Sequence, residues 1–348
     1  MNTLRLSQSP YFSIHPAAAW YLADLGEFRG KQELYTRQSP QRLKVLREHA
    51  LIESAVSSNR IEGVTLEASR VRDVLVAPKP LFRDRNEEEV RGYRDALDWI
   101  HREAAGISLS EENILRLHAL ARGQIWDAGQ YKEKDGDIIE RYADGSERVR
   151  FRPVPAARTG EAMAALVADW QRCLDEAWVH PLIALAAFNL DFLCIHPFRD
   201  GNGRVSRLLW LLQSHRLGYE VGRYISLERL VEENKARYYE TLEQSSQGWH
   251  EGKHDPWPYI NFVLYILKTA YREFAERVGE VSAPRGSKRE LVLAALARIA
   301  GEFTVAELER ACPGVSRDMI RLVLRERQAQ GMLVCEGRGP AARWRKKG

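Results

Sequence analysis

One stretch of this sequence limits its fold more than any other: an apolar helical segment that runs without a spacer into a polar loop and a second helix. Residues 180–195, HPLIALAAFNLDFLCI, are apolar on most helical faces, and Pro181 suits a first helical turn. Such a helix has to be enclosed by other elements, so we expect it at the centre of a mostly α-helical domain. After the loop, residues 205–212 place apolar side chains at helical spacing and predict a second helix with a buried face.

Helical periodicity continues through most of the chain. The further helices that we predict cover residues 39–63, 87–106, 109–125, 159–178, 203–217, 226–247 and 256–279. Ser110 suits the N-cap of the third of these, because acidic residues follow it. Residues 129–156 differ, since Asp144-Gly145 stands between charged, β-tolerant segments, which predicts a β-hairpin.

The composition is that of an ordinary globular protein, with 45% hydrophobic and 29% charged residues over 348 positions. No run approaches the roughly 18 apolar residues of a membrane span, and the first residues, MNTLRLSQSPYFSIHP, lack the features of an export signal. The four cysteines are far apart and form no CxxC pair, which speaks against a disulfide framework or a zinc site. We therefore expect a cytoplasmic protein that does not bind a membrane.

Basic charge is concentrated in the C-terminal segment. Residues 285–348 hold 14 Lys and Arg against 7 Asp and Glu, although the net charge of the whole chain is only +4. Three predicted helices and a glycine-turned hairpin over residues 288–348 resemble a winged-helix domain. Arg317, Arg321 and Arg325 recur at i+4 on the third helix, which suits contact with the phosphates or the major groove of double-stranded DNA. Winged helices also bind proteins, and an arginine stripe is commonly a solvated face, so both interpretations stay open.

The polar loop, within IHPFRDGNGRVSR at residues 195–207, is suited to hold an anion. Its DGNG turn precedes a helix, where unpaired backbone N–H groups and the positive end of the helix dipole converge. Gly201 and Gly203 allow a bulky anion to approach the backbone closely. Arg204 and Arg207 are three residues apart on the helix, so they point the same way and can both bind phosphate.

Two further residues of the loop indicate the chemistry. Asp200 beside a polyphosphate would be repulsive unless a cation lay between them, and Mg²⁺ typically bridges a carboxylate and phosphate oxygens. His196, at the end of the apolar helix, can accept a proton from a hydroxyl near neutral pH. A DGNG turn or a His-Pro helix end alone is more often structural, but all of these residues in one order favour nucleotidyl transfer.

Residues 196–207 match the signature HxFx(D/E)GNGRxxR of the Fic family at every specified position, and the chain resembles a Fic-domain protein adenylyltransferase over about residues 50–280. Such enzymes move AMP from ATP to a target hydroxyl. The resemblance implies a Fic-type helical bundle with a β-hairpin flap, Mg²⁺ as cofactor and ATP as substrate. It assigns His196 as general base, Asp200 as Mg²⁺ ligand, Gly201, Asn202 and Gly203 as the phosphate cradle, Arg204 and Arg207 as phosphate clamps, and Phe198 as a buried anchor of the loop.

Two segments outside the loop also resemble the family. Ser58, Glu62 and Gly63 fit the inhibitory pattern (S/T)xxxE(G/N), which implies that Glu62 pairs with Arg207 and removes a γ-phosphate clamp. A solvated carboxylate at a helix end is the alternative interpretation. The second segment is similar to the family's helix that flanks the nucleotide base, and it matches that helix at Asn234, Tyr238 and Tyr239. These residues are equally typical of a hydrophobic core.

In Fic proteins a flap, here near Asp144-Gly145, adds an extended segment of the target protein as a strand and so presents its hydroxyl. Two residues depart from the family pattern: Lys132 stands where arginine is frequent, and Asn189 stands where many members have histidine. We expect neither to touch the chemistry, although both bear on the choice of target. The resemblance also implies a homodimer.

We therefore expect an N-terminal helical region with the inhibitory helix at 1–95, a Fic catalytic core at 96–280, a linker at 281–287 and a winged-helix-like domain at 288–348. The expected function is AMP transfer to Ser, Thr or Tyr hydroxyls of protein targets and of the protein itself. The alternatives are a DNA-binding transcriptional regulator whose Fic-like domain senses nucleotide, and a Fic enzyme that removes AMP or transfers another phosphate-containing group. An intact base at His196 favours catalysis over sensing.

Overall fold

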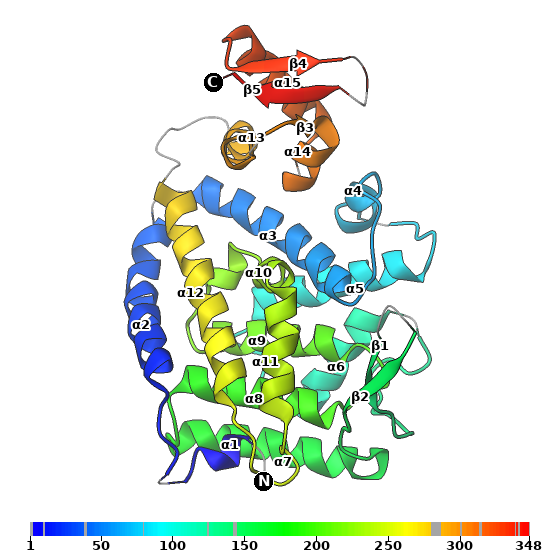
Figure 1. Ribbon diagram of the computed structural model, residues 1–348, viewed down its shortest axis with the longest axis vertical. Coiled ribbons are helices and arrows are strands. Elements are labelled where there is room, and N and C mark those ends of the chain that lie inside the picture. The colour runs from blue at the N-terminus through cyan, green and yellow to red at the C-terminus, as the bar shows by residue number, and fades with distance from the viewer. Residues whose placement is uncertain are drawn as a thin grey trace.

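The structure is a computed structural model that describes residues 3–9, 11–37, 40–78, 80–123, 125–141, 145–279, 287–299, 301–312, 315–337, 339 and 342–347. Within them the chain is mostly helical, as predicted, and its strands are short (Figure 1). The helices of the main body are α1 (Thr3–Leu6), α2 (Pro16–Arg37), α3 (Pro40–Ile61), α4 (Val71–Leu75), α5 (Arg85–Glu103), α6 (Glu111–Arg122), α7 (Ala156–Asp175), α8 (Pro181–Ile195), α9 (Asn202–Arg216), the 3₁₀ helix η1 (Val221–Arg223), α10 (Leu227–Glu233), α11 (Lys235–Ser246) and α12 (Trp257–Gly279).

Helix α8 lies at the centre of the main body, as its apolar sequence predicts. Helices α7, α9, α11 and α12 pack around it, together with the short α1. Nearly all of its side chains are buried, including the polar Asn189 and Asp191. One cluster of buried hydrophobic side chains runs from Leu4 to Phe274, so the N-terminal helices share a core with the helices around residues 196–201, the predicted catalytic loop (called the catalytic loop below).

Helix α2 lies along one side of the main body, and α3 crosses the end that faces the C-terminal domain (Figure 1). Helix α2 packs against α12, and α3 packs against α5 and α10 (Figure 1). Helix α3 also contacts α9, and α9 contacts α5 and α6. This arrangement brings the end of α3, which carries the predicted inhibitory residues, next to the helix that follows the catalytic loop.

The segment 226–247, predicted as a single helix, is two helices in the structure. Helix α10 ends at Glu233 and α11 begins at Lys235, with Asn234 between them at φ −111° and ψ 28°. The side-chain amide of Asn234 donates to the carbonyl oxygen of Leu230 at 2.8 Å. Asparagine competes in this way for backbone groups of a helix, which explains the break that periodicity alone did not indicate.

Strands β1 (Ile138–Arg141) and β2 (Glu147–Phe151) pair antiparallel, which confirms the predicted hairpin. Residues 142–144, which include Asp144 of the predicted turn, lie outside the described residues, and Gly145 has a φ of +84°. Arg148 of β2 donates to Glu243 of α11 at 2.7 Å. The hairpin is therefore attached to the main body near the end of α11.

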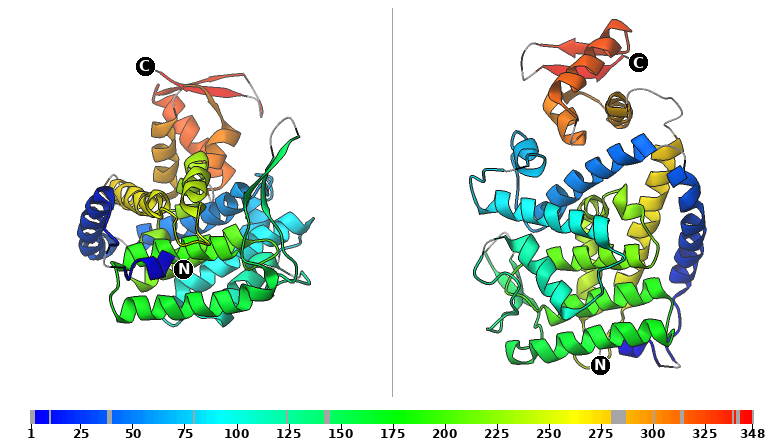
Figure 2. Two further views of the ribbon diagram at one scale, coloured as in Figure 1. Left: turned by 60° about the horizontal axis from the view of Figure 1, so that its bottom comes forward. Right: turned by 180° about the vertical axis from the view of Figure 1, so that it is seen from behind.

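The C-terminal domain has a hydrophobic core of its own, built around residues such as Val292, Ile320 and Trp344. It lies at the opposite end of the molecule from α7 (Figures 1 and 2). Its elements are α13 (Ser287–Arg298), β3 (Phe303–Thr304), α14 (Val305–Ala311), α15 (Arg317–Ala329), β4 (Leu333–Glu336) and β5 (Arg343–Lys346). Its sheet has the strand order β3-β5-β4 and is antiparallel. The winged-helix assignment stays a prediction, and most of the predicted linker falls in 280–286, outside the described residues.

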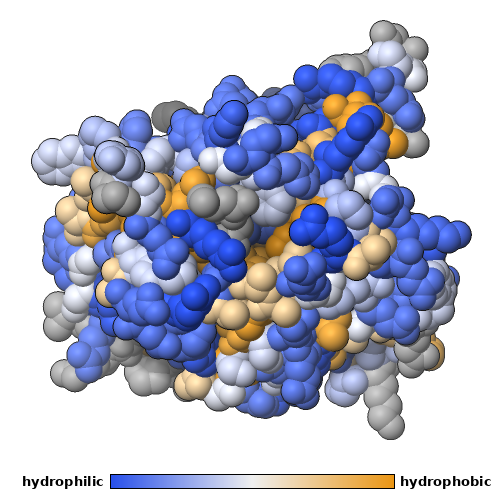
Figure 3. All heavy atoms as spheres, turned by 90° about the horizontal axis from the view of Figure 1, so that it is seen from below, coloured by the Kyte–Doolittle hydropathy of each residue, from blue (hydrophilic) through white to orange (hydrophobic). Residues whose placement is uncertain are grey.

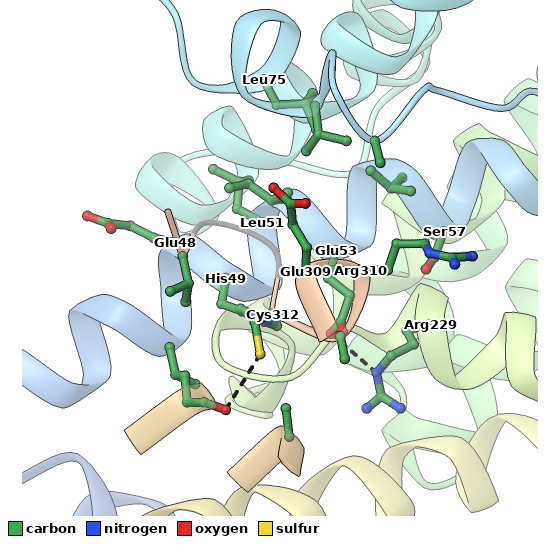
Figure 4. Close-up of a pocket in the computed structure, with 18 of the residues that line it drawn as sticks. Glu48, His49, Leu51, Glu53, Ser57, Leu75, Arg229, Glu309, Arg310 and Cys312 are labelled. Carbon is green, nitrogen blue, oxygen red and sulfur yellow. Dashed lines mark hydrogen bonds and ion pairs between the residues drawn. The ribbon is translucent and has the colours of Figure 1, made fainter. Parts of the chain in front are cut away.

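A cleft with a volume of about 1460 Å³ lies between α3 and the C-terminal domain. Figure 4 shows His49 and Glu53 of α3 in this cleft together with Cys312, which follows α14. Arg229 of α10 also lines it, and its guanidinium Nε lies 3.2 Å from a carboxylate oxygen of Glu53. His196 does not line the cleft, so this space is separate from the catalytic loop.

Hydrophilic residues predominate on the face drawn in Figure 3, with smaller hydrophobic areas between them. In the part of the chain that the structure describes, no helix is long and apolar enough to cross a membrane. The cysteines are free thiols, and burial raises the pKa of Cys173 to about 11. That thiol is therefore protonated near neutral pH and acts as a small apolar side chain.

Candidate active site

The loop between α8 and α9 presents the start of a helix. Gly201 is the N-cap of α9 at a φ of +85°, a left-handed conformation that favours glycine. Among the described residues no side chain caps this end, so the backbone N–H groups of the first turn can bind an anion. The geometry fits the phosphate cradle that the sequence predicts.

The loop is held in place around its aromatic anchor. The ring of Phe198 stacks on the imidazole of His118 in α6, with 3.8 Å between the ring centroids. The side-chain amide of Asn202 accepts from the N–H of Phe198 at 2.9 Å and donates to its carbonyl oxygen at 2.7 Å. The N–H of Gly129 donates to Nδ1 of His118, so Nε2 carries the proton and donates to the carbonyl oxygen of Asp200 at 3.0 Å. Asn202 thus shapes the cradle through its side chain.

His196 ends α8 in a left-handed conformation, with φ 52° and ψ 61°. Its Nδ1 lies 3.3 Å from the carbonyl oxygen of Leu193, and because a carbonyl oxygen only accepts, Nδ1 carries the proton and Nε2 keeps a lone pair. Burial lowers the pKa of His196 to about 4, with Lys132 acting in the same direction and Glu62 and Asp200 against it. The imidazole is therefore neutral at pH 7 and can accept a proton.

A network of buried charges lies beside the loop. Glu89 of α5 accepts from Nη1 of Arg204 at 2.6 Å and from Nη1 of Arg122 in α6 at 2.7 Å. Arg122 also donates to Oδ2 of Asp200 at 2.7 Å. Arg204 and Arg122 are buried, so the carboxylate of Glu89 offsets part of the cost of taking two cations out of water. Glu89, Arg122 and His118 could not be recognised from the sequence, because their positions beside the loop depend on contacts between helices.

Asp200 is the accessible acid of this network, with 57% of its side chain exposed. Burial alone would raise its pKa, but Arg122 and Arg204 lower it, so the carboxyl is ionised at neutral pH. No group of three or more His, Cys, Asp or Glu that could enclose a metal ion occurs among the residues described. An accessible carboxylate beside a phosphate cradle nevertheless fits Mg²⁺, which takes most of its ligands from phosphates and water.

Arg207 is held by the end of α3. Its Nε donates to Oγ of Ser58 at 2.9 Å, and its Nη2 donates to the carbonyl oxygen of Ser58 at 3.0 Å and to Oε1 of Glu62 at 2.8 Å. Gly63 follows with a φ of +82°. A methyl group at Gly203 would overlap the carboxylate of Glu62, so this carboxylate lies against the first turn of α9. A carboxylate of the protein therefore lies in contact with Gly203, one residue of the predicted cradle.

The three residues predicted to flank the nucleotide base differ in their surroundings. The amide of Asn234 is bonded to a backbone carbonyl of α10, as described above, and Tyr238 is buried among aromatic rings of the core. Tyr239 is half-buried, with the guanidinium of Arg150 in β2 at 5.4 Å from its ring centroid. Burial and the charge of Glu62 both raise the pKa of Tyr239. Of the two tyrosines, Tyr239 is the more accessible.

The fold is shared with solved structures. A Fic family protein from Desulfovibrio desulfuricans matches with a TM-score of 0.61 at 25% identity, over 98% of each chain. A Fic domain containing signaling protein from Bacteroides thetaiotaomicron matches with a TM-score of 0.61 at 22% identity, over 75% of this chain and 99% of its own. This chain therefore has the fold of Fic proteins.

Part of the chain is also similar in sequence to a known family. Residues 108–213, which contain α6 and the catalytic loop, match the Fic/DOC family. The protein adenylyltransferase Fic of Nematostella vectensis is 26% identical over 226 residues, which are 62% of this chain and 47% of that protein. The protein adenylyltransferase fic-1 of Caenorhabditis briggsae is 27% identical over 239 residues, or 65% and 41%. The chain spans about half the length of the curated relatives it matches, and its residues 108–213 are similar to the Fic/DOC family.

Proposed function

We propose that this protein is a Mg²⁺- and ATP-dependent adenylyltransferase that moves AMP from ATP to a Ser, Thr or Tyr hydroxyl of a target protein and of itself. The observation that carries the proposal is the position of His196, a partly buried and neutral imidazole in the loop that leads to the uncapped start of α9. This combination supplies a base for a hydroxyl and an anion site for a phosphate. Relatives named protein adenylyltransferase, at 26% and 27% identity, support the same reaction.

In the proposed reaction the hydroxyl oxygen of the target attacks the α-phosphorus of ATP. The new O–P bond forms as the bond from the α-phosphorus to the bridging oxygen breaks, and pyrophosphate leaves. Nε2 of His196 takes the hydroxyl proton, while the first N–H groups of α9 stabilise charge on the α-phosphate oxygens. Arg204 and Arg207 hold the terminal phosphates, so the departing oxygen stays in line with the attacking one.

Asp200 is the proposed metal ligand. Bound Mg²⁺ would neutralise charge on the phosphates. The side chain of Asp200 accepts from Arg122 at 2.7 Å, and its carbonyl oxygen accepts from His118 at 3.0 Å. Arg122 is itself anchored on Glu89. These contacts fix the loop around Asp200 before any ligand binds.

The proposal includes an inhibitory role for Glu62. Its carboxylate takes up one donor of Arg207 and lies against Gly203. A phosphate of ATP would need the same donor and the same space, and it repels a carboxylate at contact distance. ATP that binds while Glu62 stays paired has its α-phosphate out of line with the attacking hydroxyl, so transfer is slow.

The hairpin β1–β2 is the proposed docking site for an extended segment of the target. Among the described residues these two strands pair only with each other, so an outer edge can accept a third strand. Ile139 and Val149 face one another across the hairpin and are each 45% exposed. Main-chain hydrogen bonds at this edge would register the target hydroxyl while placing little demand on the target sequence.

Mass spectrometry of the purified protein after incubation with Mg-ATP tests the proposal. Transfer adds about 329 Da, the mass of an AMP adduct, as expected for in-line transfer to phosphorus. We expect Glu62→Gly to increase the adduct and His196→Ala to abolish it. An adduct that persists in His196→Ala, or one that stays absent in Glu62→Gly, contradicts the proposal.

A second proposed function, carried by the C-terminal domain, is binding of double-stranded DNA. Arg317, Arg321 and Arg325 are exposed on α15. Arg317 lies 3.6 Å from a carboxylate oxygen of Glu309, whereas Arg321 and Arg325 lie further along the helix. Exposed arginines one turn apart suit contact with successive phosphates, and the basic excess of the segment attracts polyanions over a longer range.

A further inference from the structure

Lys132 lies beside the catalytic loop, although from the sequence we expect it to have no part in the chemistry. Its main-chain N–H donates to the carbonyl oxygen of Pro197 at 2.8 Å. Its Nζ donates to the carbonyl oxygen of Ile195 at 3.1 Å. One residue therefore contacts both neighbours of His196. Lys132 belongs to the segment between α6 and β1, so these bonds join the loop to the chain that enters the hairpin.

The conformation of His196 explains why such support is needed. A residue other than glycine is strained at a φ of 52°, and strain of this kind persists only where the surroundings fix the backbone. The N–H of His196 donates to the carbonyl oxygen of Phe192 at 2.9 Å. That bond fixes the entry to the turn, and the bonds from Lys132 fix the carbonyl groups on either side of the imidazole.

Lys132 also brings a charge to this place. Partial burial lowers its pKa to about 8, although Asp135 acts against the shift. The positive charge of Lys132 lowers the pKa of His196, whereas the carboxylates of Glu62 and Asp200 raise it. The ammonium is therefore charged at pH 7, and its charge is lost as the pH rises through about 8.

We propose that Lys132 is a positioning residue for the base: its ammonium and its N–H clamp the backbone on both sides of His196 and so fix the orientation of the imidazole. The inference rests on the proposed AMP transfer and adds to it a residue that does not touch the substrate. Without the ammonium, the carbonyl group of Ile195 is released, the turn relaxes and proton transfer slows. ATP, which the arginines hold, binds as before. An arginine at this position keeps a donor for the carbonyl and stays charged at every working pH.

The experiment uses the full chain with Glu62→Gln, which relieves the proposed inhibition. In this background Lys132→Met is compared with Lys132→Arg and with the control Lys134→Met, which alters an exposed lysine of the same segment. Transfer rates and ATP binding are measured over a range of pH. We expect Lys132→Met to lower kcat about tenfold, the effect of one charge-assisted hydrogen bond, with ATP Kd unchanged. Lys132→Arg should retain kcat and move the alkaline fall of kcat from near pH 8 to higher pH.

A second measurement does not depend on activity. NMR signals of the imidazole of His196, assigned through His196→Ala, report its surroundings without nucleotide. We expect Lys132→Met to shift these signals and Lys134→Met to leave them in place. Unchanged signals and an unchanged kcat in Lys132→Met overturn the positioning role, as does an alkaline fall that does not move in Lys132→Arg. If no variant transfers AMP, the proposed function fails, whereas the NMR signals still decide whether Lys132 positions His196.

Discussion

Replacing Glu62 by glutamine tests the proposed inhibition, because the change removes a charge and keeps the shape of the side chain. In the structure Oε1 of Glu62 lies 2.8 Å from Nη2 of Arg207, which also donates to the carbonyl oxygen of Ser58. The amide of glutamine accepts a weaker hydrogen bond from a guanidinium and does not repel phosphate. We therefore expect Arg207 to become available to ATP in Glu62→Gln.

The size of the effect follows from the strength of this one contact. A hydrogen bond to a charged group contributes about 1.5–3 kcal/mol. Because 32% of the Glu62 side chain is accessible, solvent screening favours the lower end of that range. At about 1.4 kcal/mol for each factor of ten, the rate of AMP transfer should rise roughly tenfold. Glu62→Gly also clears the space beside Gly203 and should give at least the same increase.

Initial rates of AMP transfer over a range of ATP concentrations measure the effect and separate kcat from KM. Glu67→Gln is a suitable control, since it removes an exposed carboxylate from the segment after α3. A rate that Glu62→Gln leaves unchanged, or that Glu67→Gln raises equally, refutes the reasoning. Tighter ATP binding without faster transfer also refutes it, because the proposed inhibition acts on the alignment of the α-phosphate.

Three further predictions concern other parts of the molecule. Glu89→Gln should lower the rate of AMP transfer roughly 10- to 100-fold, because Arg122 and Arg204 each lose a charge-assisted hydrogen bond. Transfer rates and ATP titrations measure the effect, and the control Glu112→Gln, at an exposed residue, should leave both unchanged. Burial lowers the pKa of His101 to about 3, so between pH 3 and the ordinary pKa near 6.5 the unfolded chain binds more protons. The free energy of unfolding should therefore fall by about 2 kcal/mol from pH 7 to pH 5 through this residue. Urea unfolding of wild type and His101→Asn at both pH values tests it, and an equal fall in both would contradict it. Replacement of Arg321 and Arg325 by alanine should weaken duplex DNA binding and reduce its dependence on salt, measured by fluorescence anisotropy; a wild-type chain that does not bind DNA even at low ionic strength would rule this function out.

The catalytic loop could be predicted from the sequence because its features are local. The residues from His196 to Arg207 are neighbours along the chain, and helical spacing alone places Arg204 one turn before Arg207 in α9. The burial of α8 likewise follows from its composition. The pairing of Glu62 with Arg207 joins distant segments, and it could be predicted only because both residues belong to motifs of one family.

Contacts between helices far apart in the sequence could not be predicted in the same way. Glu89 belongs to a run of three glutamates whose members look alike in the sequence, and only the fold decides which of them faces Arg122 and Arg204. Helix α2 was not predicted, because Gly26 and Gly30 weaken its helical pattern. Its packing against α12 compensates for that weakness, and such packing is not visible in a local pattern.

The sequence does not show which of the two departures from the family pattern, Lys132 or Asn189, bears on the reaction and which on stability. In the structure the buried amide of Asn189 donates to the carbonyl oxygen of Ser206 at 2.6 Å and accepts from the hydroxyl of Tyr259 at 2.6 Å, so it ties α8 to α9 and α12. Lys132 instead bonds the carbonyl oxygen of Ile195, directly before the base. Replacing Asn189 should therefore lower the free energy of unfolding, because it leaves buried polar groups without partners. Replacing Lys132 should change the pH dependence of transfer, because its hydrogen bonds hold the backbone on both sides of His196, the proposed base.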